Sequence, residues 1–239
     1  MSGHSHFATI KHKKEAEDAK RSKAFSKVSQ ILTLAAREGG GDPGSNPKLR
    51  IALSQAKEAN MPSENIERAI KKGTGELAGG TLEAVSYEAY GPGGIAIIID
   101  GITDNKNRSL GEVKKILNEH NGKLVQEGAV RWMFEQKGII ALDMEGKDKE
   151  QTELAAIEAG ADDVIVGEGM LEIYTKPDEL EKVRKALEDK GLVTKSTLLG
   201  WIAKEKIILP DAEKESCQKL FEALDENDSV QEVYSNLKV

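Results

Sequence analysis

Cysteine and aromatic residues are scarce in this sequence of 239 residues, which contains one cysteine and 4% aromatic residues. The single cysteine, Cys217, excludes an internal disulfide. It is followed at helical spacing by Leu220, Phe221 and Leu224. This pattern predicts that Cys217 is a small buried side chain on a helix.

Long apolar stretches are also missing. No run of about 18 apolar residues occurs, which argues against a membrane-spanning helix. The first residues, MSGHSHFATIKHKK, lack the apolar core of a secretory signal. Hydrophobic residues make up 38% of the chain and charged residues 31%, a balance typical of a folded chain with a large wetted surface. We therefore expect a cytoplasmic protein that does not insert into membranes.

The net charge of −7 is distributed unevenly along the chain. Residues 1–75 hold 14 Lys and Arg against 8 Asp and Glu, a net charge of +6. Residues 76–239 hold 20 against 33, a net charge of −13. This asymmetry is expected when one domain meets phosphates while the rest stays soluble. A basic face that is merely solvated is the alternative.

Apolar residues at helical spacing predict three helices near the N-terminus. The first runs from about residue 14 to residue 37, and the glycine-rich segment 39–44 ends it. Asn46 and Pro47 supply an N-cap and a first-turn proline for the second helix. A third helix runs from near Ser63 to Gly73. Residues 1–78 are therefore expected to form a basic helical domain.

The period changes from helical to alternating after this domain. Residues 85–89 alternate as in a strand, residues 91–94 predict a hairpin turn, and the apolar run 95–99 predicts a strand that is covered on both faces. A helix from about Ser109 to His120 follows, and Val130, Trp132 and Phe134 alternate as a further strand. These elements predict a second, α+β domain.

The remaining residues predict a third domain inside the second. Residues 137–203 have the order βαββαβ, which is typical of a ferredoxin-like unit. The tail, with a strand near Ile207, a helix over 211–224 and a strand over 230–237, lacks partners unless it joins the strands of residues 84–134. The expected fold is α+β and multidomain: an N-terminal three-helix bundle plus two α+β domains, at least one ferredoxin-like. The expected boundaries are 1–78, 79–136 with 204–239, and an inserted 137–203.

Several long motifs connect this sequence with a known family. They include GHS and IKHKK near the start, DAKRSKAFSK, AAREGGGDPGSNPKLR, AKEANMPSENIERAIKKGTGE, YEAYGPGG, TDNKNRS, AGADDV and VYSN. With these motifs the chain resembles the YebC-type family over nearly its whole length. Eukaryotic relatives of that family include the mitochondrial translational activator of cytochrome oxidase subunit one. The resemblance implies a three-domain cytoplasmic protein that is not an enzyme and regulates transcription by binding DNA or acts in translation at the ribosome.

Basic residues of the N-terminal domain are the best candidates for contacts with phosphates, since each contact releases condensed counterions. Glu15, Glu17 and Asp18 can pair with neighbouring cations at helical spacing, so the basic face is not uniformly positive. The candidate nucleic-acid-binding residues in this domain are Lys11, His12, Lys13, Lys14, Lys20, Arg21, Lys23, Lys27, Arg50, Lys71 and Lys72.

A polar loop in the second domain is a further candidate. Asn105, Lys106, Asn107 and Arg108 follow a buried strand and carry groups that suit phosphates or base edges. An Asx turn that caps the next helix explains the same residues equally well. Tyr87, Tyr90 and Trp132 could stack on bases if exposed, although the alternation predicts that some of them lie in the core.

Catalytic and cofactor sites are not expected. His4, His6 and His12 have no neighbouring cysteine or carboxylate cluster that would complete a metal site. The glycine-rich segments lack the Gly-Lys-Ser/Thr ending of a phosphate-binding loop. Asp162 and Asp163 are adjacent, so in a strand their side chains point to opposite faces. We expect no enzyme activity, no cofactor, no metal and no small-molecule substrate.

The sequence thus predicts a non-enzymatic regulator of gene expression that binds nucleic acid. It is either a DNA-binding transcriptional regulator or a ribosome-associated translation factor that binds ribosomal RNA. The absence of a clear dimerising helix-turn-helix slightly favours RNA. The alternative is a protein-interaction scaffold that binds a basic partner through its acidic α+β domains. Reversing the charge of Lys13, Lys14, Lys20 and Arg21 separates the two hypotheses.

Overall fold

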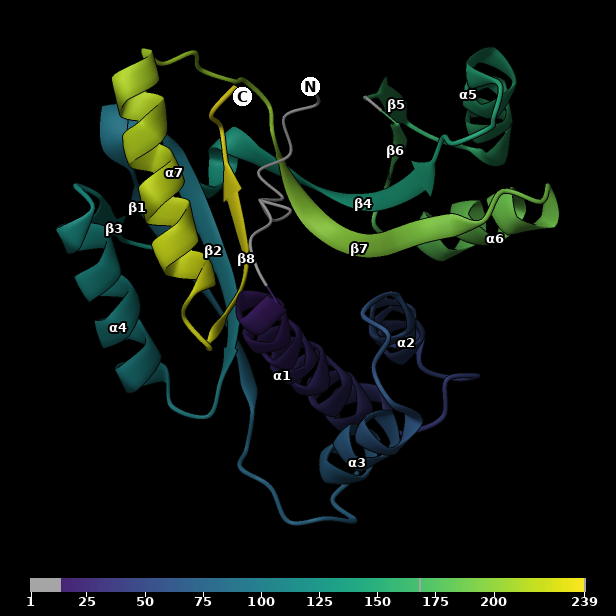
Figure 1. The fold of residues 1–239 in the computed structure, drawn as a ribbon, viewed down its shortest axis with the longest axis horizontal. Coiled ribbons are helices and arrows are strands. Elements are labelled where there is room, and N and C mark those ends of the chain that lie inside the picture. Colours follow the sequence, from purple (N-terminus) through teal and green to yellow (C-terminus); the bar gives the residue numbers. More distant parts are fainter. Residues whose placement is uncertain (1–13, 168, 239) are drawn as a thin grey trace. The chain divides into compact units, whose positions relative to one another are not determined.

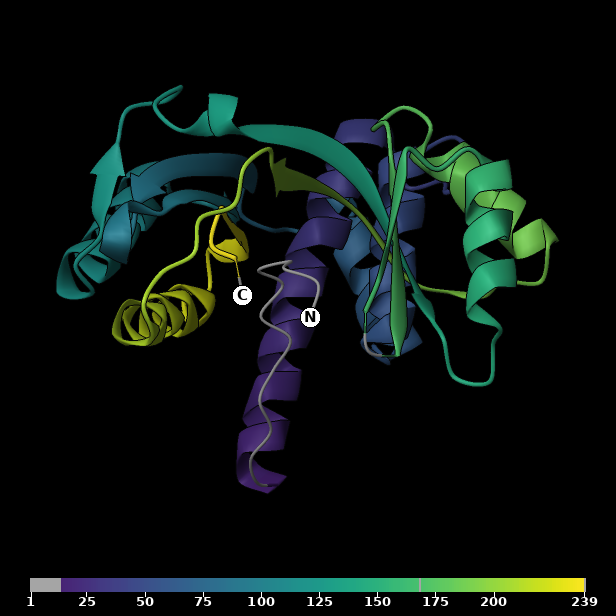
Figure 2. The ribbon, with the colours of Figure 1, turned by 90° about the horizontal axis from the view of Figure 1, so that it is seen from above.

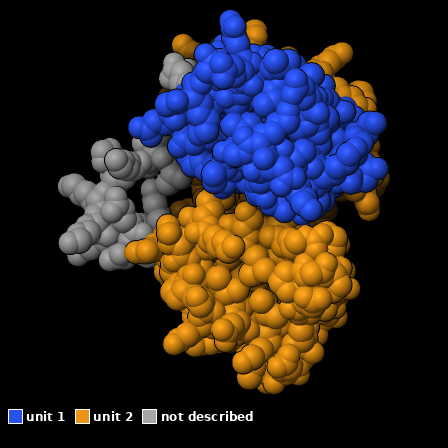
Figure 3. All heavy atoms as spheres, turned by 90° about the vertical axis from the view of Figure 1, so that its right-hand side faces the viewer, with its two compact units in different colours: residues 1–3, 135–202 blue, residues 4–134, 203–239 orange. Residues whose placement is uncertain are grey.

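The computed structural model describes residues 14–167 and 169–238. The chain divides into two compact units, coloured separately in Figure 3. In the described part of the chain, one unit comprises residues 135–202, and the other comprises residues up to 134 together with 203–238. No helix among the described residues is long and apolar enough to cross a membrane.

The larger unit begins with the predicted three-helix bundle, which is confirmed. Its helices are α1 (Lys14–Gly39), α2 (Pro47–Glu58) and α3 (Ser63–Gly73). Figure 2 shows the N-terminal end of α1 extending beyond α2 and α3. Their common core consists of Leu32, Ala35, Ala36, Leu49, Ala52, Ala56, Met61 and Ala69. The Thr33 hydroxyl donates to the Ala69 carbonyl at 3.1 Å, which fastens α1 to α3.

Asn46 fixes the glycine-rich loop between α1 and α2. Its side-chain oxygen accepts from the backbone N–H of Leu49 at 3.1 Å and so caps α2, as predicted. Its amide group donates to the carbonyls of Ala35 and Gly40, both at 2.8 Å. Because Asn46 is buried and all these groups are satisfied, the loop is part of the bundle's structure.

The same unit contains a four-stranded sheet in the order β3-β1-β2-β8 (Figure 1). Neighbouring strands are antiparallel. Its elements are β1 (Glu83–Tyr90), η1 (Pro92–Gly94), β2 (Ala96–Thr103), α4 (Lys106–Glu119), β3 (Lys123–Val125), η2 (Arg131–Met133), α7 (Asp211–Asp225) and β8 (Val230–Ser235). β8 therefore joins the C-terminal segment to strands from the first half of the chain.

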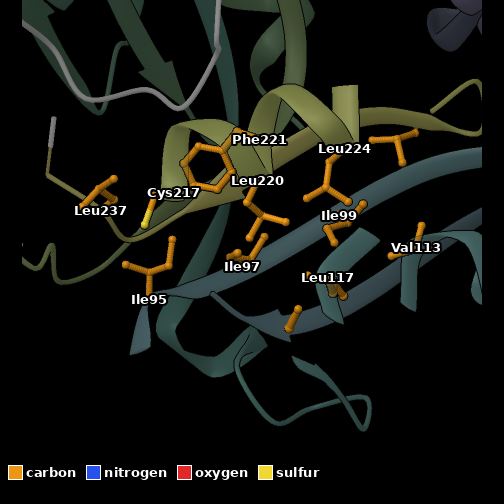
Figure 4. Packing of buried hydrophobic residues seen from close by; sticks show 12 residues of the cluster. Ile95, Ile97, Ile99, Val113, Leu117, Cys217, Leu220, Phe221, Leu224 and Leu237 are labelled. Atoms are coloured by element: carbon orange, nitrogen blue, oxygen red, sulfur yellow. The ribbon is translucent and has the colours of Figure 1, made fainter. Parts of the chain in front are cut away.

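Two helices cover one face of this sheet. Figure 4 shows Ile97 and Ile99 of β2 packed among Leu117 of α4 and Leu220 and Leu224 of α7. Residues 95–99 are all fully buried, which confirms that this strand is covered on both faces. Cys217 is buried in the same core, as predicted, and burial raises the pKa of its thiol.

Three local predictions for this unit need correction. The helix expected from about Ser109 begins at Lys106, because Asn105 caps it. The strand expected over 130–134 is instead the short 3₁₀ helix η2, followed by a strand that starts at Phe134. Glu88 accounts for this 3₁₀ helix, because its carboxylate accepts from the successive backbone N–H groups of Val130 and Arg131 and draws the chain out of an extended path. The strand expected near Ile207 is a single bridge to Leu237.

The smaller unit has the predicted βαββαβ order, and the expected ferredoxin-like arrangement is confirmed. Its elements are β4 (Phe134–Asp143), α5 (Lys149–Ala159), β5 (Asp163–Val166), β6 (Met170–Thr175), α6 (Leu180–Asp189) and β7 (Thr194–Ala203). The strands lie in the order β5-β6-β4-β7. Strand residues Ile140 and Ile173 and helix residues Ala156 and Leu187 are fully buried. The division into three domains stays a prediction.

Candidate nucleic-acid interface

The candidate residues of the N-terminal tail are only partly described. Lys11, His12 and Lys13 lie outside the described residues. Lys14 and Lys20 belong to α1, but their side chains lie outside the description. Arg21 is exposed, and its guanidinium lies 5.7 Å from the centre of the Phe25 ring. This is a cation–π contact, in which the guanidinium lies over the face of the ring.

Two candidate lysines of α1 have partners within the protein. The Lys23 ammonium lies 2.9 Å from the Glu226 carboxylate, and that of Lys27 lies 2.6 Å from Asp225. These lysine side chains are only 20% and 14% exposed. Nearby, the Gln231 amide donates to the Gln30 side chain at 2.7 Å. Lys23 and Lys27 therefore hold α1 against the C-terminal end of α7.

Arg50 also contributes to the structure of the bundle. Its guanidinium donates to the carbonyls of Pro43 and Gly44 in the loop between α1 and α2. Asp42 accepts from the backbone N–H of Gly44 in the same loop, and this bond is the largest cause that lowers the pKa of Asp42. The arginine therefore braces the loop from the side of α2.

The end of α3 differs from these paired sites. Lys71 and Lys72, both candidates from the sequence, are exposed in the last helical turn. Arg68, which the sequence analysis missed, is also exposed and precedes them at the spacing i, i+3, i+4. Within the described part of the chain, none of the three forms an ion pair. The same spacing in the sequence was the signal that could have identified Arg68.

The polar loop before α4 is organised as a helix cap. The Asn105 side chain accepts from the backbone N–H of Arg108 at 3.1 Å, as the Asx-turn interpretation predicts. Arg108 pairs with Asp104 at 2.5 Å. Lys106 pairs with Glu83 at 2.5 Å, and this hydrogen bond and the charge of the lysine lower the pKa of Glu83. Asn107 is exposed. The two cations of this loop are thus already beside carboxylates.

The three aromatic candidates differ in exposure. Tyr87 is partly buried, and its hydroxyl lies 2.6 Å from that of Ser109. Tyr90 is 37% exposed and Trp132 is 67% exposed. Of the three rings, only that of Trp132 is mainly in solvent.

Glu88 anchors the segment that carries this tryptophan. Its side chain is 1% exposed, and its carboxylate accepts from the backbone N–H groups of Gly128, Val130 and Arg131 at 2.8, 2.8 and 3.1 Å. The Arg131 guanidinium lies 3.2 Å from the same carboxylate. Burial opposes the ionisation of Glu88, but the three backbone donors and Arg131 outweigh it, so its pKa is lowered.

No group of His, Cys, Asp and Glu that could hold a metal ion occurs among residues 14–167 and 169–238. This finding says nothing of His4, His6 and His12, which precede the described residues.

Comparisons with known proteins cover nearly the whole chain. A family model described as "TACO1/YebC protein N-terminal domain" matches residues 5–76, and one described as "TACO1/YebC second and third domain" matches residues 82–237. A protein of Persephonella marina named "Probable transcriptional regulatory protein" is 48% identical over 241 residues, which cover 100% of this chain and 96% of the relative. A protein of the same name from Halothermothrix orenii is 46% identical over 242 residues, with the same coverage.

A solved structure shows the same fold. The crystal structure of a conserved hypothetical protein from Aquifex aeolicus superposes with a TM-score of 0.90 at 44% identity. The match covers 98% of this chain and 97% of that protein. Together with the two family models and the relatives of nearly equal length, these matches confirm the resemblance, and the chain belongs to the TACO1/YebC family.

Proposed function

We propose that this protein is a non-enzymatic, cytoplasmic regulator of gene expression that binds DNA or ribosomal RNA through its helical bundle. Relatives of the same length are named probable transcriptional regulatory proteins, which supports a regulatory role rather than an enzymatic one. The observation that carries the proposal is the group of exposed cations Arg68, Lys71 and Lys72 at the end of α3, which we call the α3 cations.

The α3 cations suit phosphates for two reasons. They lie on one side of the helix, because residues three and four positions apart are neighbours on a helical surface. They are also exposed and lack ion-pair partners among the described residues, so a phosphate need not displace a carboxylate. Phosphate contacts of this kind bind nucleic acid with little sequence preference and weaken as salt rises.

Charge reversal tests this assignment. Fluorescence anisotropy would measure the affinity of a labelled ribosomal RNA fragment and a DNA duplex for the wild type and for the variant Arg68→Glu, Lys71→Glu, Lys72→Glu. The matched control is Lys149→Glu, Lys182→Glu, Lys185→Glu, which makes the same charge change at exposed positions of the other unit. We expect the α3 variant to lose affinity at least tenfold, and the slope of log affinity against log salt to fall by about 2 to 3. The control should remain near the wild type.

Equal affinities of the α3 variant and the control would contradict the assignment of the α3 cations. The choice between the two polymers comes from sedimentation of lysates through sucrose gradients at two salt concentrations, with and without nuclease. Salt-sensitive comigration with ribosomes that survives mild nuclease would identify a translation factor. Absence from ribosomes together with tighter binding of the DNA duplex would identify a transcriptional regulator.

A further inference from the structure

Trp132 is a large aromatic side chain that is 67% exposed although both of its flanks are anchored. Val130 is fully buried and Phe134 is 3% exposed. Between them, η2 turns the tryptophan outward. An exposed indole leaves a large apolar surface in water, and tryptophan is enriched where proteins meet their ligands.

The hydrogen bonding of the indole restricts what that ligand can be. Its Nε1–H donates to the Ala129 carbonyl at 3.0 Å, so the polar edge of the ring is used within the protein. What remains for a partner is the π-face. A flat π-face of fixed orientation suits stacking on another planar group better than hydrogen bonding.

The buried Glu88 carboxylate holds this ring in place before any ligand binds. The carboxylate accepts hydrogen bonds from three backbone N–H groups of the segment 128–131, directly before Trp132. These hydrogen bonds hold the segment 128–131 in one conformation. Preorganisation of this kind reduces the entropy that is lost on binding.

A cation accompanies the ring. The Lys204 ammonium donates to the carbonyl of Trp132 at 2.8 Å, and the backbone N–H of Lys204 donates to the carbonyl of Met133 at 2.9 Å. The lysine is exposed, so it can reach a phosphate while a base lies on the indole. Binding sites for single strands combine an aromatic platform with a nearby cation in this way.

The surroundings of the ring favour a nucleic acid over a protein partner. Gln126, Glu127 and Lys204 are exposed polar residues, and Arg131 is 32% exposed. An apolar docking surface for a protein needs a contiguous patch of apolar side chains. A base needs only one ring face.

We propose that Trp132 is a stacking platform for an unpaired base of a single-stranded nucleic acid, with Lys204 placed for the adjoining phosphate. This inference rests on the proposed function, to which it adds contacts with bases. It also separates two tasks: the α3 cations bind any phosphate backbone, whereas Trp132 selects strands with an accessible base.

The test compares Trp132→Ala with Trp132→Phe, which keeps an aromatic face. The probes are a labelled 12-nucleotide oligouridylate and an RNA duplex of the same length. We expect Trp132→Ala to weaken binding of the single strand roughly tenfold and to leave the duplex unchanged, and Trp132→Phe to retain most of the affinity. In a Trp201→Phe background Trp132 is the only tryptophan. Binding of the oligouridylate should then quench the fluorescence of Trp132. Because the ring is exposed, the unfolding midpoint should change little in either variant.

Four outcomes are informative. Single-strand affinity and fluorescence that do not respond to Trp132 would overturn the platform, while the loss of binding in the α3 variant would still support the proposed function. Equal weakening of both probes by Trp132→Ala would overturn the selectivity for single strands. Unchanged RNA affinity with lost comigration on ribosomes would assign the ring to a protein partner instead. If the wild type binds neither these probes nor the DNA duplex at low salt, the proposed function itself fails.

Discussion

Lys23 and Lys27 of α1 and the α3 cations lie in the same small bundle but have different surroundings. Lys23 and Lys27 of α1 are mostly buried and lie against Glu226 and Asp225, about 200 residues later in the chain. The α3 cations are exposed and form no ion pair among the described residues. The difference teaches that a count of basic residues mixes cations that hold the fold with cations that are available to a ligand.

The comparison extends to carboxylates. Asp225 and Glu226 are 61% and 74% exposed, whereas Glu88 is 1% exposed. Exposed ion pairs contribute little to stability because water competes for both partners. A buried carboxylate with several donors contributes more, because its removal leaves those donors without partners. Stability and binding should therefore respond to different charged residues.

The largest loss of stability is expected at Glu88. The variant Glu88→Gln keeps the shape of the side chain but removes its charge and one acceptor oxygen, while three backbone N–H groups and Arg131 still require partners. We expect the free energy of unfolding to fall by about 3 kcal/mol. Urea denaturation measures this. A loss as small as that of an exposed charge would show that the segment 128–131 does not depend on Glu88.

The pH dependence of stability should report on the same group. The pKa of Glu88 is lowered from its usual 4.5 in the folded state, so its contribution is present above pH 4.5 and is lost as the pH falls through the folded value. Wild type should therefore lose stability below about pH 4.5, and Glu88→Gln should lose less over the same interval. Urea midpoints between pH 7 and pH 3 measure both. Parallel curves for the two proteins would contradict the lowered pKa.

A smaller effect is expected where α1 meets the C-terminal end of α7. The variant Lys23→Glu, Lys27→Glu places carboxylates against Glu226 and Asp225, and we expect a loss of about 1 to 2 kcal/mol in the free energy of unfolding. Adding Asp225→Lys and Glu226→Lys should restore much of it, because the pairs reform with opposite polarity. The control is Lys48→Glu, Lys219→Glu, which breaks two pairs with exposed lysines. If the Lys23→Glu, Lys27→Glu variant is as stable as this control, the contact between α1 and the end of α7 contributes no more to stability than an exposed ion pair.

Local patterns predicted much of this fold. The three helices, the strand buried on both faces and the burial of Cys217 follow from periodicity over a few residues, and each is present. The 3₁₀ helix η2 was not predicted, because its cause is a carboxylate about 40 residues earlier in the chain. The alternation of Val130, Trp132 and Phe134 instead indicated a strand, and this hid the exposure of the tryptophan.

The candidate site was harder to predict than the fold. Lys27 and Lys71 look alike in the sequence, as cations on amphipathic helices. Only the partner of Lys27, 198 residues away, distinguishes them. Arg68 could have been found from its spacing to Lys71 and Lys72 on the same helix. Pairing between distant segments is the information that local patterns lack.

The smallest effect on stability is expected for the α3 cations themselves. The variant Arg68→Gln, Lys71→Gln, Lys72→Gln removes their favourable interaction with the end of the helix, which should cost less than about 0.5 kcal/mol in the free energy of unfolding. Its affinity for RNA should nevertheless fall, whereas Lys23→Gln, Lys27→Gln should lose stability but keep its affinity per folded molecule. Urea denaturation and anisotropy on both variants measure the four quantities. If the α3 variant lost stability and kept its affinity, its cations would hold the bundle, and the distinction between the two helices would be reversed.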